Sequence, residues 1–212
     1  MTTKHPKPAD AMIYVVDDDD LVRRATVRTF ASLGFQVTSF QTASEFLDHD
    51  RCDLPGCLIL DVQMPGQTGI ELQQELAAHH VDLPIVFITG HGDIPMSVKA
   101  MKAGAVDFLP KPVDEQQLVQ AVSQAINRHA ETRHQTAELD EFRRRVDTLT
   151  KREHEVMNLV VRGVLNKQIA RRLGIAEDTV KVHRGRVMSK TGVDSLAELV
   201  RLSERSGVAA PD

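Results

Sequence analysis

The sequence predicts two domains, an α/β domain with a parallel sheet covered on both faces and a smaller all-α domain behind it. Five short apolar runs alternate with stretches of helical length over the front part of the chain. The charge is also divided, because residues 1–130 carry 10 basic and 17 acidic residues while residues 131–212 carry 16 and 13. A length of 212 residues suits two modest domains, and the charge difference favours two domains with different partners.

The composition excludes several other classes of protein. With 42% hydrophobic and 26% charged residues, the chain resembles neither a disordered protein nor a fibrous one. No apolar run approaches the ~20 residues that span a bilayer, and Met1–Asp10 has no apolar core, so we expect neither a signal peptide nor a membrane partner. Two cysteines, Cys52 and Cys57, are too few for a disulfide framework or a four-ligand zinc site. We therefore expect a cytoplasmic protein with reduced thiols.

The five apolar runs are the predicted strands. Three of them are almost continuously apolar, which is typical of parallel strands that are buried on both faces. In chain order, the predicted strands are Met12–Val16, Gln36–Phe40, Cys57–Leu60, Ile85–Thr89 and Val106–Leu109.

Apolar residues at helical spacing predict the helices between the strands. The predicted helices are Leu21–Leu33, Ile70–Ala78, Ile94–Ala103 and Asp114–Arg128. Gly34 and Gly104 follow two of these helices and are expected to end them. The core face of the first helix is expected at Val22, Ala25, Thr29 and Leu33.

Polar side chains stand at the carboxyl ends of the predicted strands, where open α/β sheets bind their ligands. In a sheet of order 2-1-3-4-5 the first and third strands are neighbours, so Asp17, Asp18 and Asp61 would converge. Three crowded carboxylates call for a hard divalent cation such as Mg²⁺, and Lys111 across from them would then contact a phosphate. The helix dipole alone would account for Asp19 and Asp20 at a helix start, but not for the other acids.

The strings VVDDDDLVRR, LILDVQMPGQTGIEL and IVFITGHGDIPMSVKAMKAGAVDFLPKP resemble the receiver domain of two-component response regulators. The resemblance covers about residues 12–127 and implies a flavodoxin-like (βα)5 fold with the parallel order 2-1-3-4-5. It implies that Asp61 is the phospho-acceptor and that a sensor histidine kinase supplies the phosphoryl group. It also implies Mg²⁺ or Mn²⁺ held by Asp17, Asp18, Asp61 and the backbone carbonyl of Gln63.

The same resemblance assigns roles near the last two strands. Lys111 would pair with the phosphoryl oxygens, and the Lys111–Pro112 peptide would be cis. Thr89 and Phe108 would form the switch that responds to phosphorylation, although Phe108 could also be an ordinary core residue. His91 could tune dephosphorylation or be a simple loop residue.

The segment Asn127–Leu149 is polar and predicted to be helical, since it lacks glycine and proline. Apolar residues recur in it at spacings of three, four and three, as in a coiled-coil seam. These residues are Leu139, Phe142, Val146 and Leu149. Two interpretations stay open, a short coiled coil and a helical linker that packs on a neighbouring domain.

Capping signals divide the rest of the chain into four short helices. Thr150-x-x-Glu153 predicts a capping box with Leu149 as its staple residue, and Ser195-x-x-Glu198 predicts the start of the last helix. Asn166 is expected to cap the second helix. A turn after a glycine then leads to Asp178–Lys190, and this pair of short helices is the outline of a helix-turn-helix.

Periodicity divides the helix at Asp178–Lys190 into two faces. Val180, Val187 and Met188 are expected in the core. The residues expected on the opposite face are Lys181, Val182, Gly185, Arg186 and Ser189. An exposed valine beside basic residues suits the major groove of DNA, where thymine methyl groups and phosphates are available. The alternative places Val182 in the core and leaves a soluble basic helix.

The string LTKREHEVMNLVVRGVLNKQIARRLGIAEDTVKVHRGRVMSKTGV resembles the four-helix DNA-binding domain of LuxR, FixJ and NarL-type regulators, across about residues 147–207. The resemblance implies double-stranded operator or promoter DNA as a partner. The residues implied to contact DNA are Asn166, Lys167, Lys181, Val182, Arg184 and Arg186. The chain departs from the family at Gly185, where other members carry a side chain, and at Ala176, where they carry a serine or threonine cap.

Together these observations predict a phosphorylation-dependent transcriptional regulator that is most similar to FixJ-type proteins and is not a dedicated enzyme. The receiver would catalyse its own Mg²⁺-dependent phosphorylation and slow autodephosphorylation, and phosphorylation would shift dimerisation and DNA binding. RNA polymerase is a further expected partner, and the expected dimer surface is formed by residues 94–103, 106–109 and 114–128. The expected segments are a flexible N-terminus at 1–11, a receiver at 12–127, a helical linker at 128–148, a helix-turn-helix domain at 149–207 and a tail at 208–212.

Two rival functions remain at this point. An aspartate-nucleophile phosphatase also carries acids after its first strand, but Asp18-x-Asp20 is followed here by Leu21 and Val22 rather than the residues such enzymes need. A constitutive DNA-binding protein could use its receiver only for dimerisation.

Overall fold

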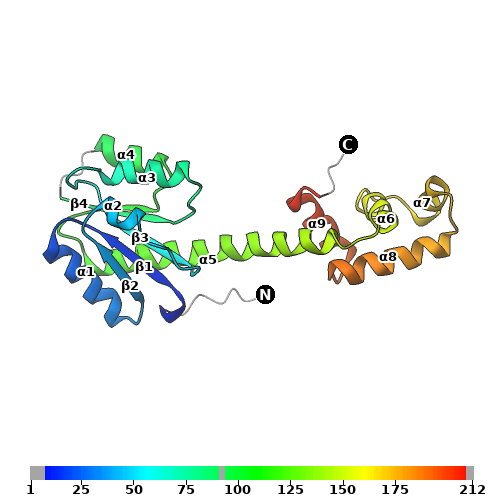
Figure 1. The fold of residues 1–212 in the computed structure, drawn as a ribbon, viewed down its shortest axis with the longest axis horizontal. Helices are drawn as coiled ribbons and strands as arrows, with labels where there is room; N and C mark the ends of the chain where they lie inside the picture. The colour runs from blue at the N-terminus through cyan, green and yellow to red at the C-terminus, as the bar shows by residue number, and fades with distance from the viewer. Residues whose placement is uncertain (1–7, 91–93, 209–212) are drawn as a thin grey trace. The chain divides into compact units, whose positions relative to one another are not determined.

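The structure is a computed structural model that describes residues 8–90 and 94–208. The chain forms two compact units, Met1–Arg133 and His134–Asp212. The first unit is built around a parallel sheet, and the elements of the second unit within residues 134–208 are all helices (Figure 1).

The sheet of the first unit has the strand order β2-β1-β3-β4-β5, with every neighbouring pair parallel, so the predicted topology is confirmed. Its strands are β1 (Met12–Val16), β2 (Gln36–Phe40), β3 (Gly56–Asp61), β4 (Ile85–Thr89) and β5 (Asp107–Pro110). Strand β3 is longer than predicted at both ends, because Gly56 pairs with Met12 and Asp61 pairs with Ile88. Asp61 is therefore the last residue of the strand itself.

Within residues 8–90 and 94–146, five α-helices accompany the sheet. They are α1 (Asp20–Ser32), α2 (Ala43–Leu47), α3 (Gly69–Ala78), α4 (Ile94–Lys102) and α5 (Glu115–Val146), after a 3-10 turn at Pro8–Asp10. Helix α2 is too short to show a periodic pattern in the sequence, and it begins where the Thr42 side chain accepts a hydrogen bond from the Glu45 backbone N–H.

The predicted core face of α1 is wrong in part. Thr26 and Phe30 are buried, whereas Ala25 is exposed and Leu33 is 46% exposed. The buried stripe follows a spacing of four residues through Thr26 and Phe30, each one position beyond the predicted Ala25 and Thr29. Leu33 is the C-cap of α1, so it lies outside the helical periodicity.

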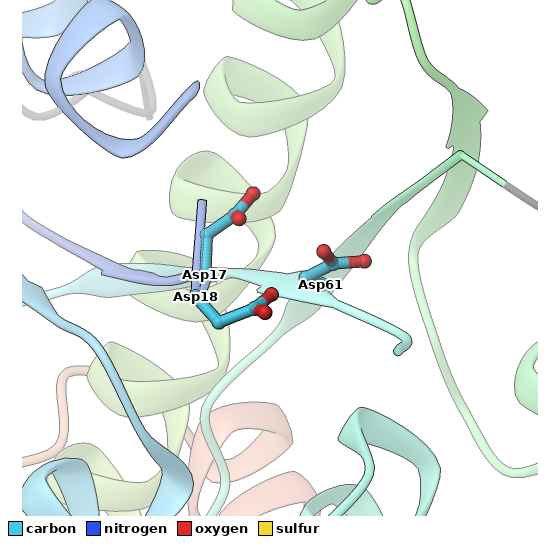
Figure 2. Close-up of side chains that lie close together, drawn as sticks. All are labelled: Asp17, Asp18 and Asp61. Atoms are coloured by element: carbon cyan, nitrogen blue, oxygen red, sulfur yellow. The ribbon is translucent and has the colours of Figure 1, made fainter. Parts of the chain in front are cut away.

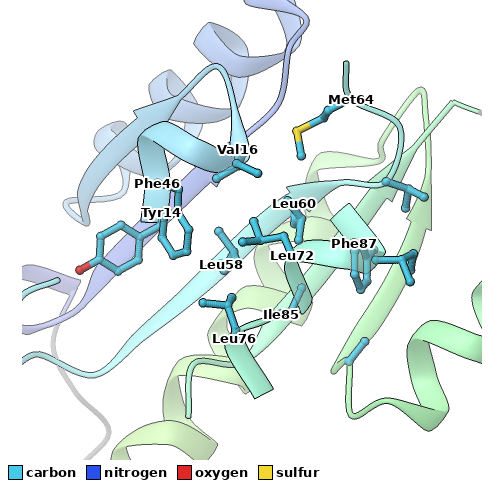
Figure 3. Packing of buried hydrophobic residues seen from close by; sticks show 14 of the residues in the cluster. Tyr14, Val16, Phe46, Leu58, Leu60, Met64, Leu72, Leu76, Ile85 and Phe87 are labelled. Carbon is cyan, nitrogen blue, oxygen red and sulfur yellow. The ribbon is translucent and has the colours of Figure 1, made fainter. Parts of the chain in front are cut away.

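Two apolar cores lie on the two faces of the sheet. One core joins the sheet to α2, α3 and α4, and Figure 3 shows Phe46, Leu58, Leu72 and Phe87 packed within it. The other core joins the opposite face to α1 and α5. Because both faces are covered, the central strands β3 and β4 are buried throughout and end in the polar residues Asp61 and Thr89, so a functional site is expected at the carboxyl edge of the sheet.

The last predicted helix of the front domain and the predicted linker form one continuous helix, α5. Its first part contributes Leu118 and Val122 to the core of the first unit. Its last part contributes Phe142 and Val146 to the core of the second unit, where both are buried. The apolar seam is therefore used within this chain, and the interpretation as a helix packed on the neighbouring helices is confirmed.

The second unit also contains α6 (Lys151–Val161), α7 (Asn166–Leu173), α8 (Glu177–Thr191) and α9 (Leu196–Ser206). The capping box of Thr150 and Glu153 at α6 is confirmed. Ser195 caps α9 as expected, but the Glu198 carboxylate accepts from the Asp194 backbone N–H rather than from Ser195. Ala176 makes no side-chain cap at α8, as its residue type predicts.

The expected cap at Asn166 is wrong. The N-cap of α7 is Leu165, which has no polar side chain, and Asn166 is the first helical residue. The Asn166 amide bonds instead to Arg184 of α8, a contact that only the folded unit reveals. Among the described residues, no helix is long and apolar enough to cross a membrane.

Candidate functional site

Three carboxylates meet at the carboxyl edge of the sheet, as the strand order predicts. Asp17 and Asp18 follow β1, Asp61 ends β3, and Figure 2 shows their side chains gathered at this edge. One oxygen of each carboxylate lies within 4.8 Å of the others. Asp17 is fully buried and Asp61 is 5% exposed, whereas Asp18 is only half-buried.

Backbone hydrogen bonds hold two of these acids in place. The Asp19 N–H donates to Asp17 Oδ1 at 2.9 Å, and the Gln63 N–H donates to Asp61 Oδ1 at 3.3 Å. Arg23 of α1 donates through Nη1 to the Asp17 carbonyl oxygen at 2.7 Å. This role of Arg23 could not be predicted from the sequence, because nothing in a helix start indicates which backbone carbonyl the side chain will reach.

Lys111 bridges the two buried acids. Its Nζ lies 2.8 Å from Asp17 Oδ2 and 2.7 Å from Asp61 Oδ2. The Lys111 backbone N–H donates to the Thr89 carbonyl oxygen at 2.6 Å, which fixes the lysine beside the end of β4. The predicted cis peptide between Lys111 and Pro112 is confirmed. The lysine contacts carboxylates in this structure, whereas the sequence predicts a contact with a phosphate.

The electrostatics of this edge favour a further cation. Burial raises the pKa of the Asp17 carboxyl, despite the opposing effect of Lys111. Burial alone would lower the pKa of the Lys111 ammonium, but its bonds to Asp17 and Asp61 outweigh this and raise it. Three carboxylates face one lysine, so two negative charges remain for a metal ion to compensate. Carboxylate oxygens at this spacing fit Mg²⁺, which binds through a few carboxylates and completes its shell with water or phosphate oxygens.

Gly69 is a second residue that the sequence analysis missed. It begins α3, and a Cβ atom there would lie 2.2 Å from the Asp61 carbonyl oxygen and 3.0 Å from Leu60 Cγ. The Gly69 N–H donates to the Val62 carbonyl oxygen at 3.0 Å. A glycine is therefore needed here so that the chain can pass directly behind the Asp61 backbone. A glycine near a loop carries no hint of such a contact in the sequence.

The remaining predicted residues of this domain lie along β4 and β5. Thr89 is fully buried at the end of β4. Phe108 is half-buried, and its ring centroid lies 6.0 Å from that of Phe87 in the core shared with α3 and α4. His91 lies outside the described residues. Cys52 and Cys57 are both free thiols.

The second set of predicted residues lies on α8. Val180 and Val187 are buried in the core of the second unit, while Lys181, Gly185 and Arg186 are exposed. Val182 is 52% exposed, so the alternative that places it in the core is wrong.

The basic side chains on and beside α8 differ in their partners. Lys181 pairs with Asp178 at 2.8 Å, and both side chains are exposed. Arg184 is half-buried and donates through Nη1 to Asn166 Oδ1 at 2.7 Å. Lys167 is exposed on α7. This face therefore presents cations and one apolar side chain to solvent, the combination that suits a DNA groove.

A parallel α/β domain with an acidic cluster and a lysine at its carboxyl edge, followed by a helix-turn-helix domain, defines a response regulator. Residues 13–123 match the family described as the response regulator receiver domain, and residues 147–203 match the bacterial regulatory proteins of the luxR family. The chain belongs to these families. It is a transcriptional regulator of the FixJ-like, two-component type rather than a dedicated enzyme.

Individual proteins support this assignment. The chain is 46% identical over 200 residues to Nodulation protein W of Bradyrhizobium diazoefficiens, covering 94% of this chain and 88% of that protein. It is 42% identical over 212 residues to the transcriptional regulatory protein FixJ of the same organism, covering 98% of each. A solved structure of the response regulator StyR is 51% identical, covers 93% of this chain and 100% of that chain, and has a TM-score of 0.82.

Proposed function

We propose that Asp61 accepts a phosphoryl group from a phosphohistidine of a sensor histidine kinase, and that this phosphorylation controls binding to operator DNA. The observation that carries the proposal is the position of Asp61. Its carboxylate ends β3 at the sheet edge, is 5% exposed, and lies 2.7 Å from Lys111 Nζ and beside two further acids.

The transfer step is a displacement at phosphorus. An Asp61 carboxylate oxygen forms the new P–O bond while the P–N bond to the kinase imidazole breaks, and the imidazole nitrogen keeps the electron pair. Such a transfer needs positioning and charge neutralisation more than covalent assistance. Lys111 would exchange its contact with Asp61 Oδ2 for one with a phosphoryl oxygen, and so it would neutralise charge where charge develops.

Asp17, Asp18, Asp61 and the Gln63 backbone carbonyl would hold Mg²⁺ or Mn²⁺. The bound ion supplies charge neutralisation to the phosphoryl oxygens. The same residues would support autophosphorylation from small acyl phosphates and slow autodephosphorylation by water.

Thr89 and Phe108 would report the phosphorylated state to the surface of the receiver. Phosphorylation adds nearly two negative charges and new acceptor oxygens, to which the Thr89 hydroxyl can donate. Movement of Thr89 would leave room for the Phe108 ring, which has no hydroxyl and must act through packing. The result would be a homodimer through residues 94–103, 106–109 and 114–128, where Val98 and Met101 are each 44% exposed on α4.

On the output side, the residues that would contact DNA are Asn166, Lys167, Lys181, Val182, Arg184 and Arg186. RNA polymerase would be the partner of the bound dimer, and the protein would act in the cytoplasm. The receiver would span residues 12–127, the helical linker 128–148 and the DNA-binding domain 149–207, with short ends at 1–11 and 208–212.

The proposal is tested by incubating the full chain with Mg²⁺ and a small acyl-phosphate donor, and comparing the wild type with Asp61→Asn. We expect a mass increase of one phosphoryl group, dimer formation and tighter DNA binding in the wild type alone. Equal changes in both variants would reject Asp61 as the acceptor. Tight operator binding by both proteins without metal or donor would favour a constitutive DNA-binding protein, and turnover of a phosphomonoester would favour a phosphatase.

A further inference from the structure

A side-chain hydrogen bond joins α7 and α8, the two helices of the helix-turn-helix. Asn166, the first residue of α7, accepts a hydrogen bond at its Oδ1 from Nη1 of Arg184, in the middle of α8. The distance is 2.7 Å, and 18 residues separate the two in sequence. A short bond to a charged donor is among the stronger hydrogen bonds in proteins. The side-chain oxygen of Asn166 therefore accepts from a guanidinium and not from the backbone N–H groups of its own helix.

Arg184 differs from two other cations of α8. Lys181 is paired with Asp178 at 2.8 Å, and Lys190 is paired with Glu153 at 2.6 Å. In the part of the chain that the structure describes, no carboxylate lies within ion-pair distance of Arg184, whose bond is to a neutral amide. The guanidinium keeps its full charge, and it has five N–H donors, of which Asn166 takes one.

Open space lies beside this pair. A hollow of about 460 Å³ is lined by Asn166, Lys167, Glu177 and Arg184, together with apolar residues that include Leu165 and Leu196. A long arginine side chain at the border of such a hollow has several rotamers available, and ordering it on binding costs affinity. The hydrogen bond that Arg184 donates to Asn166 selects one of these rotamers before any partner binds.

We propose that Asn166 is a positioning residue for DNA binding, which acts by holding the charged guanidinium of Arg184 in the orientation that meets DNA. The inference rests on the proposed function, because it takes Arg184 as a DNA contact. It revises the role of Asn166 from a direct contact to a support. Its neutral amide is suited to this task, since an aspartate at the same place would hold the guanidinium but cancel its charge.

The test is a double-mutant cycle on the phosphorylated full chain. Asn166→Ala, Arg184→Ala and the double variant are measured by fluorescence anisotropy against a short random-sequence DNA duplex over a series of salt concentrations. We expect Asn166→Ala to weaken binding by about two- to tenfold. In the Arg184→Ala background, the same change should have no further effect. Gln168→Ala, an exposed amide on the same helix, is the matched control and should leave binding unchanged.

A second variant gives a result that loss of folding would not produce. Asn166→Asp should preserve the thermal unfolding midpoint, because it can still accept from Arg184. It should nevertheless bind DNA more weakly than Asn166→Ala and show a shallower salt dependence, because one phosphate-neutralising charge is lost.

Three outcomes would overturn the inference. These are an unchanged affinity in Asn166→Ala, additive effects in the double variant, and wild-type affinity in Asn166→Asp. Measuring Arg186→Ala as well shows whether such a result rejects only the positioning role of Asn166 or also the proposed DNA contacts. If Arg186→Ala weakens binding but Asn166→Ala does not, only the positioning role is wrong. If neither Arg184→Ala nor Arg186→Ala weakens binding, the proposed DNA contacts are wrong as well.

Discussion

The two candidate sites handle charge in opposite ways. At the sheet edge, Asp17 and Asp61 are buried and share one lysine, whereas on α8 the charged Lys181 and Arg186 are exposed. Charges in a low-dielectric interior interact strongly and depend on their counterions. Exposed charged side chains interact weakly and are screened by salt, so they can leave one ion-pair partner for another with little loss of free energy. The buried acids and the lysine of the receiver site therefore hold one fixed arrangement, whereas the exposed cations of α8 can exchange their ion-pair partners for DNA phosphates.

The largest effect should come from removing the cation of the buried site. Lys111→Met leaves Asp17 and Asp61 without their shared counterion, and breaking a buried pair costs on the order of 3 kcal/mol of unfolding free energy. We expect lower stability in the absence of metal, partial recovery with Mg²⁺, and loss of phosphorylation. Tyr14 is the only tyrosine of a chain without tryptophan and is buried in the first unit, so its fluorescence can follow urea unfolding there.

Lys102→Met is the matched control, since Lys102 is exposed on α4. It should change the stability by less than ~0.5 kcal/mol. Equal losses in the two variants would mean that Lys111 has no special electrostatic role, and the contrast between the two sites would then be wrong.

A smaller effect is expected from the backbone that supports Asp61. In Gly69→Ala, the new Cβ would meet the Asp61 carbonyl oxygen at 2.2 Å, so the chain must shift. Overpacking of this kind costs ~1–3 kcal/mol. Both the urea midpoint and the rate of phosphorylation by an acyl-phosphate donor should fall, because the displaced atoms belong to the acceptor residue.

Gly185 on α8 provides the counterpart for this prediction. A Cβ there meets no atom within 4 Å, and alanine is favoured over glycine within a helix by ~0.5–1 kcal/mol. Gly185→Ala should therefore raise the stability of the second unit slightly. A loss of stability at Gly185, or none at Gly69, would contradict the difference in packing between the two sites.

In the second unit, the buried Glu153 pairs with Lys190, whose side chain is 37% exposed. Glu153 accepts from Lys190 Nζ at 2.6 Å and from the Thr150 N–H at 2.9 Å, and these bonds, led by the one from Lys190, lower its pKa to about 2. Glu153→Gln keeps an acceptor for the capping box but removes the charge, so we expect a loss of about 1 kcal/mol. Glu155→Gln, which removes a more exposed pair with Arg152, is the control and should cost less.

The pH dependence of this pair has a definite sign. The folded-state pKa of Glu153 lies below its ordinary value of 4.5, so the contribution is complete above about pH 4.5 and is lost as the pH falls toward 2. Asp17 has the opposite sign, because burial raises its pKa and the folded state holds its proton more tightly. Circular dichroism of wild type and Glu153→Gln should show stabilities that converge in acid. A constant difference over this pH range would exclude the charge as the cause.

The smallest effect is expected for the exposed pair on α8. Asp178 neutralises Lys181 at 2.8 Å, so Asp178→Asn should free the lysine for DNA and strengthen binding by about two- to fivefold at low salt. The substitution also removes an acid from the first turn of α8, which should slightly lower the stability of that helix. Glu204→Gln on α9 changes the net charge equally and serves as the control. Weaker DNA binding by Asp178→Asn would mean that Lys181 is not a DNA contact.

Local patterns predicted the five strands and the polar residues at their carboxyl ends, whereas the strand order followed from the resemblance to receiver domains. Continuous apolar runs identify covered strands, and the residue that follows each run must lie at a sheet edge. The phase of α1 was harder to predict, because apolar residues occur on more than one side of this helix, and the buried stripe passes through Thr26 and Phe30 rather than Ala25 and Thr29. The predicted cap at Asn166 was wrong for a related reason. An asparagine side chain can form a hydrogen bond within its own helix or with a neighbouring helix, and the sequence does not indicate which bond forms.

By itself, the sequence determined the two domains, their order, and the acidic, basic and apolar residues that each one offers. The tertiary structure alone decided which of these residues meet. It places Gly69 behind Asp61, Asn166 beside Arg184, and the last turns of α5 in the core of the second unit. The physical reason is the range of the interactions, since periodicity and capping act over a few neighbouring residues. Contacts between distant residues depend on how whole helices and strands pack.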